Sequence, residues 1–450
     1  MPGSQTCFAS WKCWACAWTL LHAASPAPIL GHARMLSVYL HDRPVGSIEK
    51  RGAGIRFTYA EAAVEDPATP ALSISLPKRP EPYSDRYASP YFRNLLPEQA
   101  YRGLVAAAAG TTPGDTAALL GVVGAECPGA VSIWPDGKTP PIVHEYQPLS
   151  DANLGALFTA SGRLRLGNAI ARGRLSLPGV QEKIALLRQP DGSWNLPTNG
   201  AVTSHILKQA TGDFPELLEN ELFCMTLAEN VGLRVPTTGL PSASVRVFCA
   251  ERFDRTTLGS SAGVPRQKIH QEDFCQILRV LPERKYQREG GPGITACAAV
   301  IRQFSALPAE DLPNLVRWIA LNALIGNEDA HAKNLAFLHT QGGLRLSPYY
   351  DLVSTVVFEH LERSLAMKIG GSWDVRNIQK SDWRRLAKHV DLPWNFVRVL
   401  LLELSELVVS RASEALRLCT ANYGRAEVYS RISEAVVRHA AQMDRELRTR

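Results

Sequence analysis

The sequence lacks long apolar runs, internal repeats and low-complexity tracts. A helix that spans a bilayer needs about 20 consecutive apolar residues, so we expect no membrane anchor. A strong charge of one sign is also missing, because 49 basic and 43 acidic side chains leave a net charge of only +6. That surplus is compatible with a nucleotide, an acidic partner or nearby nucleic acid, and it selects none of them. The 450 residues are enough for two or three folded domains.

The cysteines do not form the pattern of a disulfide framework. There are nine of them, an odd number. Six are scattered at long, irregular spacings: Cys127, Cys224, Cys249, Cys275, Cys297 and Cys419. Free thiols of this kind are typical of a reducing compartment, so we predict a cytoplasmic protein.

The other three cysteines lie in residues 1–34, a segment whose composition differs from everything after it. Its apolar core and Ala-rich end are compatible with a signal peptide, and its Cys13 and Cys16 have the spacing of a redox or zinc pair without second ligands. We interpret residues 1–34 as a poorly ordered extension or a mis-started segment, with Met35 as the functional beginning.

From Met35 the patterns predict a small α/β subdomain over residues 35–148. Alternating apolar residues indicate strands at 36–40, 45–48, 56–59 and 131–134, Ala-rich stretches indicate helices at 98–109 and 115–122, and 135–148 is the predicted linker.

Residues 149–255 and 256–450 are predicted to form two further parts. The first contains predicted strands at 183–187, 194–197, 204–208 and 245–254 and a predicted helix at 216–231. The second is mainly helical and includes a strongly amphipathic helix at 395–420. We therefore expect an α+β fold with two lobes, in the order of a protein kinase: a small N-terminal α/β subdomain, a strand-rich lobe and a mainly helical C-terminal lobe.

One polar loop concentrates the chemistry of the chain. An apolar helical run stops at Gly326 and is followed by Asp329, His331 and Asn334, and a short apolar stretch then leads to Asp351. Phosphoryl transfer needs one carboxylate to accept the proton of the attacking hydroxyl, and an amide oxygen and a second carboxylate to hold magnesium. A polar loop with an Asp-capped turn is the alternative for the loop alone.

Upstream residues fit the same chemistry. Lys208 ends an alternating strand, from which it can reach the phosphates of a nucleotide as a point charge. Glu219 or Glu221, on the helix that follows, can orient that lysine. Gly179 is a single glycine in a loop before a strand, so the loop lacks the G-x-G-x-x-G pattern. We expect His331 to brace its own loop.

Six short motifs resemble, in order, those of the HipA family of serine/threonine kinase toxins. They are Ser176–Lys183, Ser204–Lys208, Glu251–Arg255, His270–Cys275, Asp329–Asn334 and Tyr350–Asp351. Three N-terminal stretches, 38–48, 89–98 and 119–133, resemble the N-terminal subdomain of that family. The likeness runs from about Met35 to the C-terminal helices and leaves residues 1–34 unmatched.

The resemblance implies a role for each matching residue. Asp329 would be the catalytic base, Asn334 and Asp351 the Mg²⁺ ligands, and Ser176 the serine whose autophosphorylation expels the nucleotide loop. The expected ATP-binding residues are Pro178, Gly179, Val180, Gln181, Glu182, Lys183, Lys208, Glu251, Arg252, Phe253, His331, Ala332, Lys333, Asn334, Tyr350 and Asp351.

The resemblance also implies partners. In the family a small helix-turn-helix antitoxin, HipB, binds DNA, so this chain would contact DNA only through such a protein. The expected substrate is a serine of a translation protein, such as an aminoacyl-tRNA synthetase. Two alternatives stay open: a metal-dependent hydrolase that uses Asp329, His331 and Asp351, and a catalytically idle corepressor subunit.

Overall fold

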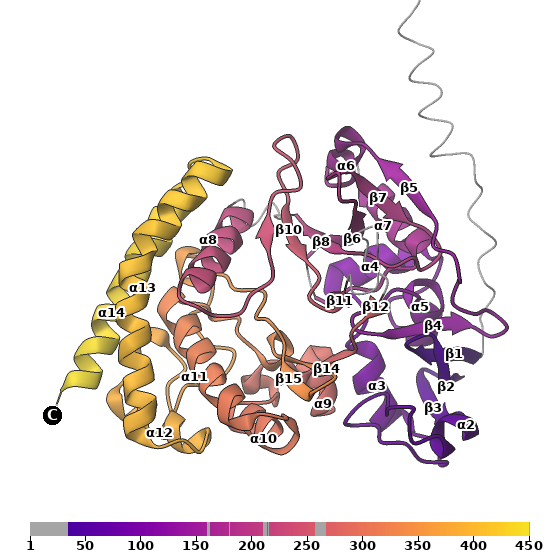
Figure 1. Ribbon diagram of the computed structural model, residues 1–450, viewed down its shortest axis with the longest axis horizontal. Coiled ribbons are helices and arrows are strands. Elements are labelled where there is room, and N and C mark those ends of the chain that lie inside the picture. The colour runs from indigo at the N-terminus through magenta and orange to yellow at the C-terminus, as the bar shows by residue number, and fades with distance from the viewer. Residues whose placement is uncertain are drawn as a thin grey trace, which may run out of the picture.

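The computed structural model describes residues 35–159, 163–179, 181–209, 214, 216–256 and 267–449. Residues 1–34 and Val180, both subjects of sequence predictions, lie outside these ranges. The sheets lie mainly in the N-terminal half of the chain and the long helices in the C-terminal half, which confirms the predicted α+β class (Figure 1). None of the described helices is long and apolar enough to cross a membrane.

The first sheet is antiparallel and has the strand order β3-β2-β1-β4. Its strands are β1 (Met35–Leu40), β2 (Arg43–Arg51), β3 (Gly54–Tyr59) and β4 (Val131–Pro135), and the neighbouring helices are α2 (Glu61–Glu65), α3 (Asp85–Arg93), α4 (Gln99–Ala108) and α5 (Thr116–Val123). The predicted strands and the two predicted Ala-rich helices of this part are therefore confirmed.

The second sheet is antiparallel and has the order β5-β7-β6-β8-β10-β9. Its strands are β5 (Tyr146–Leu149), β6 (Lys183–Arg188), β7 (Trp194–Pro197), β8 (His205–Lys208), β9 (Thr238–Gly239) and β10 (Phe248–Glu251), and its helices are α6 (Asp151–Leu157), α7 (Arg163–Gly173) and α8 (Leu217–Asn230).

Two details of this sheet differ from the sequence prediction. The predicted linker 135–148 ends inside β5, which pairs with β7 over Tyr146–Leu149. The predicted strand 245–254 is shortened to Phe248–Glu251, because its partner β8 ends at Lys208, opposite Phe248. Both errors concern pairing with a distant strand, which a local pattern of apolar residues does not contain.

The first two sheets share a hydrophobic core. One cluster of buried side chains contains residues of β1 to β4 together with residues of β6, β7 and β8. Val38, Phe57 and Ile184, for example, are completely buried in it. The division at residue 148 into two parts stays a prediction.

The remaining strands are β11 (Arg255–Thr256), β12 (Gln267–Lys268), β13 (Gln271–Asp273), β14 (Ala336–Thr340) and β15 (Gly343–Leu346). The helices of the C-terminal half are α9 (Phe274–Ile277), α10 (Ile294–Phe304), α11 (Pro308–Ile325), α12 (Lys380–His389), α13 (Trp394–Tyr423) and α14 (Glu427–Arg448), and its short 3₁₀ turns are η2 (Pro282–Arg284), η3 (Gln287–Glu289), η4 (Ala332–Asn334), η5 (Thr355–Val357) and η6 (Val375–Asn377). Helix α13 contains the predicted amphipathic helix.

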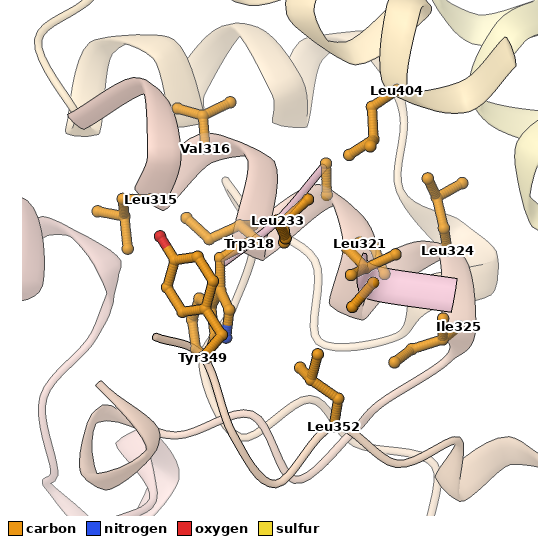
Figure 2. Close-up of a cluster of buried hydrophobic side chains, with 14 of the residues drawn as sticks. Leu233, Leu315, Val316, Trp318, Leu321, Leu324, Ile325, Tyr349, Leu352 and Leu404 are labelled. Carbon is orange, nitrogen blue, oxygen red and sulfur yellow. The ribbon is translucent and has the colours of Figure 1, made fainter. Parts of the chain in front are cut away.

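Helix α11 is the central element of the C-terminal half. Its apolar residues occur at helical spacing and pack on segments that precede and follow it in the chain (Figure 2). The Trp318 ring stacks on the Tyr349 ring with 6.2 Å between the ring centroids. Since Tyr349 lies two residues before Asp351, this packing sets the position of Asp351 relative to the end of α11.

Gly326 ends α11 and starts the polar loop. Its φ of +68° lies in the left-handed region. A Cβ atom here would come within 2.4 Å of a methyl carbon of Val356, so the position requires glycine. The Gly326 carbonyl accepts hydrogen bonds from the backbone N–H groups of Thr355 (3.0 Å) and Val356 (3.2 Å). The loop that carries Asp329 is thereby fixed at its first residue.

Candidate active site

A cleft of about 700 Å³ lies where the N-terminal and C-terminal halves meet. Fourteen of the predicted site residues line it: Pro178, Gly179, Gln181, Lys183, Lys208, Glu251, Arg252, Phe253, Asp329, His331, Lys333, Asn334, Tyr350 and Asp351. Three predicted residues are not in its lining, namely Ser176, Glu182 and Ala332. The structure thus collects side chains from distant motifs around one cavity.

Lys208 lies at the centre of the charged wall of the cleft. Its Nζ donates a hydrogen bond of 2.7 Å to Glu221 Oε1 on α8 and also contacts a carboxylate oxygen of Asp351. Glu219, the other predicted partner, is on a different side of α8 and pairs with Arg246. Burial opposes the charge on Lys208, but Asp351 and Glu221 outweigh it and raise its pKa.

Asp351 is held in an unusual backbone conformation. Its φ of +55° lies in the left-handed region, which is uncommon for a residue with a side chain and recurs at functional sites. Asn220 of α8 fixes the segment beyond it, because its amide group exchanges two hydrogen bonds of 2.7 and 2.9 Å with the Ser354 backbone. Burial raises the pKa of the Asp351 carboxyl, but Lys208 and Lys183 outweigh burial and lower it, so Asp351 is ionised.

Asn334 lies beside Asp351. Its Nδ2 is 3.5 Å from Asp351 Oδ2, and its Oδ1 accepts a hydrogen bond of 3.1 Å from the His331 backbone N–H. Amide and carboxylate oxygens are the hard ligands that Mg²⁺ prefers, and Mg²⁺ in kinases takes its other ligands from phosphates and water. The donor set of Asn334 and Asp351 therefore fits a magnesium ion that arrives with a nucleotide.

The nucleotide-loop motif contributes Gly179 and Lys183. Gly179 has a φ of +107°, and a Cβ atom there would lie 2.7 Å from Lys183 Nζ, so the lysine passes directly over the glycine. Lys183 and Lys208 are paired neighbours on β6 and β8, which places two ammonium groups on one side of the cleft. Burial lowers the pKa of Lys183 to about 8. Two adjacent cations are suited to bind a polyphosphate.

Asp329 also lines the cleft and lies in the loop that starts at Gly326. Its backbone N–H donates to Asn327 Oδ1 at 3.0 Å, and its Oδ1 accepts a hydrogen bond of 2.6 Å from the phenol of Tyr286. His331 packs its ring against Tyr286, with 5.5 Å between centroids. Burial lowers the pKa of His331 to about 4, so it is neutral near pH 7. Asp329 and Glu328 are the carboxylates of this loop that line the cleft, and the role of Asp329 as the base stays a prediction.

Two predicted nucleotide residues have side chains that are already occupied. The Arg252 guanidinium is 1% exposed and bonds to Asp254 and Glu126. Lys333 Nζ donates to both oxygens of Asn94, at 2.8 and 2.9 Å, and to Asp273 Oδ2 at 2.8 Å. The Arg252 guanidinium and the Lys333 ammonium are thus engaged in contacts within the protein. Only the backbone and the aliphatic parts of these side chains remain to contact a nucleotide.

Phe253 and Tyr350 form an apolar part of the cleft. Their ring centroids are 5.6 Å apart, and the Tyr350 hydroxyl donates a hydrogen bond of 2.8 Å to the Lys333 carbonyl. Phe253 follows the strand β10, whose last residue, Glu251, lines the cleft as well. An aromatic pair that lines a cleft suits the base of a nucleotide.

Ser176 is fully buried. Its hydroxyl donates a hydrogen bond of 2.7 Å to the Leu95 carbonyl, and its N–H donates one of 2.9 Å to the Glu126 carbonyl. In this position the hydroxyl cannot meet a phosphate donor. Any phosphorylation of Ser176 requires the loop to leave its place.

Several cleft residues were not found from the sequence. Glu98, Asp273, Lys285, Tyr286 and Glu328 all line the cleft. Glu98 starts a predicted helix and Glu328 lies in the polar loop, but no local pattern shows that the side chain of any of these five residues turns toward the cleft. His270–Cys275, which contains Asp273, was singled out only by its resemblance to the family.

The geometry weakens the hydrolase alternative. Among the described residues, no group of three or more His, Cys, Asp or Glu side chains is arranged to hold a metal ion. Asp329, His331 and Asp351 therefore do not form the three-ligand set that a catalytic zinc site would need.

Two family models match the chain: the HipA N-terminal domain over residues 36–134 and the HipA-like C-terminal domain over residues 175–412. Y4mE of Sinorhizobium fredii, a protein named as a candidate kinase, is 38% identical over 392 residues, which are 86% of this chain and 92% of that protein. The chain belongs to the HipA family.

More distant matches agree with this membership. The serine/threonine-protein kinase toxin HipA of Shewanella oneidensis is 28% identical over 348 residues, which are 73% of this chain and 77% of that protein. A solved structure of Shewanella oneidensis HipA with HipB and operator DNA matches with a TM-score of 0.76 and 21% identity, over 92% of this chain and all of the other. The two-lobed kinase-like fold is thereby confirmed, and the enzyme class is serine/threonine protein kinase.

Proposed function

We propose that this member of the HipA family transfers the γ-phosphate of ATP, with Mg²⁺, to serine or threonine residues of a protein. The observation that carries the proposal is the meeting of Lys208, Asp351 and Asp329 from three distant motifs in one cleft. Bound Mg-ATP would supply the phosphoryl group to be transferred. Lys183 and Lys208 would hold its phosphates, and Asn334 and Asp351 would hold the metal.

The acceptor hydroxyl would lose its proton to Asp329. The Tyr286 hydroxyl occupies Asp329 Oδ1, so Oδ2 is the oxygen on which a proton would be received. Glu221 keeps Lys208 charged and aimed into the cleft. Asp351 would exchange its contact with Lys208 for the metal, which leaves Lys208 free for phosphate.

The proposed biological role is that of a toxin in a toxin–antitoxin pair. Support comes from the named relative, a kinase toxin, and from the matching fold, which was solved with HipB and operator DNA. On this proposal a HipB-like helix-turn-helix protein binds this chain and carries the DNA contact. The proposed target is a translation protein, such as an aminoacyl-tRNA synthetase.

Ser176 is the proposed site of self-inactivation. Phosphate adds about −1.5 to −2 charge, which the buried position beneath Leu95 cannot accommodate, so a phosphorylated loop would stay outside the cleft. ATP binding should then fall, because Gly179 and Lys183 belong to the same loop and the strand that follows it.

The test is incubation of the purified chain with Mg-[γ-³²P]ATP, followed by mass spectrometry. We expect phosphate on Ser176, no incorporation by Asp329→Asn, and loss of ATP binding by the phosphorylated form. A catalytically idle corepressor would bind its antitoxin and incorporate no phosphate, and that result would reject the kinase proposal. Full ATP binding by phosphorylated protein would reject only the role of Ser176.

A further inference from the structure

Tyr286, which contacts the proposed base Asp329, is not among the predicted site residues. Tyr286 lies between the turns η2 and η3, and its phenol O–H donates 2.6 Å to Asp329 Oδ1. Burial first, and then the charge of Asp329, raise the pKa of this phenol, so it is protonated and donates at every physiological pH. The phenol is therefore the donor of this hydrogen bond, and Asp329 Oδ1 is the acceptor.

The backbone around Tyr286 is fixed. The Tyr286 carbonyl accepts a hydrogen bond of 2.9 Å from the Gly291 N–H. The N–H of the next residue, Gln287, donates a hydrogen bond of 3.0 Å to the Ala366 carbonyl. Gln287 Oε1 accepts 2.9 Å from the Lys368 N–H. A Cβ atom on Gly291 would lie 2.3 Å from the Arg284 carbonyl oxygen, so the tight return of the chain after Tyr286 requires glycine.

Lys285, the residue before Tyr286, is held in place by a residue of the N-terminal half of the molecule. Lys285 Nζ forms an ion pair of 2.9 Å with Glu98 Oε2, and the two side chains are 7% and 8% exposed. Burial opposes the charge of Glu98, but Lys333 and Lys285 outweigh it and lower its pKa. The Glu98 backbone N–H also donates 3.0 Å to the Gly179 carbonyl. One residue thus contacts both the nucleotide loop and the Tyr286 segment.

We propose that Tyr286 is a positioning residue for Asp329, and that the Glu98–Lys285 ion pair holds Tyr286 in register with the nucleotide loop. A carboxylate on a loop rotates freely unless one oxygen is bound. With Oδ1 held by Tyr286, Oδ2 is fixed in the direction from which the acceptor hydroxyl approaches. The N-terminal subdomain then supplies part of the catalytic geometry through Glu98. This inference rests on the proposed kinase function.

Tyr286→Phe tests the inference because it removes one oxygen and keeps the ring. The chain is mixed with Mg-ATP at a series of concentrations up to saturation, which gives the maximal rate of phosphate incorporation and the ATP concentration at half-maximal rate. We expect the maximal rate to fall by about tenfold to a hundredfold, and the half-maximal ATP concentration and the Tm to stay unchanged. Tyr146→Phe is the matched control: that hydroxyl donates 2.9 Å to a backbone carbonyl, of Val202, away from the cleft.

Glu98→Gln tests the second part, because it removes the ion pair and keeps the backbone bond to Gly179. We expect the maximal rate of phosphate incorporation to fall, as for Tyr286→Phe. In the double variant Glu98→Gln/Tyr286→Phe, the fold-decrease in this rate should be smaller than the product of the two single fold-decreases. The matched control is Glu283→Gln, since the Arg93–Glu283 pair (2.6 Å) also joins the two halves but lies on the surface.

The outcomes separate the inference from the proposed function. Wild-type protein that incorporates no phosphate rejects the kinase proposal and the inference with it. Active wild type together with a Tyr286→Phe variant of equal maximal rate rejects only the inference. A variant that loses ATP affinity or Tm in proportion to its rate shows a structural role instead, and also overturns the inference.

Discussion

The molecule contains two clusters of buried charges, one around Glu126 and one around Lys208 in the cleft, and their differences separate structure from function. In the Glu126 cluster, Glu126 pairs with Arg252, Arg255 and Lys268, and all these side chains are at most 9% exposed. In the cleft, Lys208 is 9% exposed but its partner Asp351 is 38% exposed.

The difference in exposure decides what each cluster does. The Glu126 cluster is closed, since the Glu126 side chain is completely buried and three cations with side chains at most 9% exposed surround it. Its carboxylate has no route to a ligand. The cleft cluster is open on the side of Asp351, so one of its contacts can be exchanged for a metal and a phosphate. We therefore expect charged residues of the same kinds to serve stability in one place and chemistry in the other.

The largest expected effect is on catalysis by the open cluster. Lys208→Ala and Asp351→Asn should each reduce Mg-ATP-dependent phosphate incorporation by about 10³-fold or more, because they remove the groups that bind the phosphates and the metal. Radiolabel incorporation under single-turnover conditions measures this. Labelling at the wild-type rate by either variant would show that its residue is assigned wrongly.

In the closed cluster around Glu126, a substitution should lower the stability of the folded protein. Glu126→Gln leaves Arg252 and Arg255 with Asp254 as their anion and removes the carboxylate that pairs with Lys268, so the free energy of unfolding should drop by about 3–5 kcal/mol. Urea denaturation gives this value. Glu406→Gln is the control, since its partner Arg448 lies 2.7 Å away and its own side chain is 66% exposed; its effect should stay below about 1 kcal/mol. Equal losses in both variants would contradict the assignment of the closed cluster.

A smaller effect follows from the pKa of Lys183, which burial lowers to about 8. Below this pH the ammonium is charged and can bind phosphate. Above it the free protein must take up a proton to bind, so affinity for Mg-ATP should weaken by up to about tenfold per pH unit. Titration calorimetry from pH 7 to 9.5 measures the slope. Lys183→Met should bind more weakly at pH 7 and show a flatter pH dependence; an equally steep slope in this variant would assign the proton to another group.

The smallest effect concerns the two glutamates of α8 that the sequence left open. Glu219→Gln breaks only a surface pair with Arg246, whose side chain is 54% exposed, and should change the unfolding free energy by less than about 1 kcal/mol. Glu221→Gln instead removes a buried partner of Lys208 and should slow phosphate incorporation. If the rate falls more for Glu219→Gln than for Glu221→Gln, the orientation of α8 in this account is wrong.

The sequence was sufficient for whatever depends on short-range order. Apolar alternation located β1, β6 and β8, helical spacing located α8 and α13, and the polar loop after Gly326 was found because its residues are adjacent in the chain. The HipA family resemblance placed Lys208 and Asp351 in one site, and they are in contact although they are 143 residues apart.

Long-range packing could not be predicted in this way. The direction of the Arg252 side chain depends on Glu126, a residue 126 positions earlier. The role of Tyr286 depends on Asp329, and that of Lys285 on Glu98, with no periodicity to connect them. The same limit explains β5, whose pairing with β7 the local pattern did not contain.

The most direct test of the central claim is magnesium-dependent ATP binding by the open cluster. Calorimetry with ATP, in the presence of Mg²⁺ and of EDTA, should show tighter binding with the metal in wild-type protein. Asp351→Asn should remove this difference, and Glu126→Gln should keep it at a temperature where it remains folded. Equal ATP affinity with and without Mg²⁺ in the wild type would contradict the account.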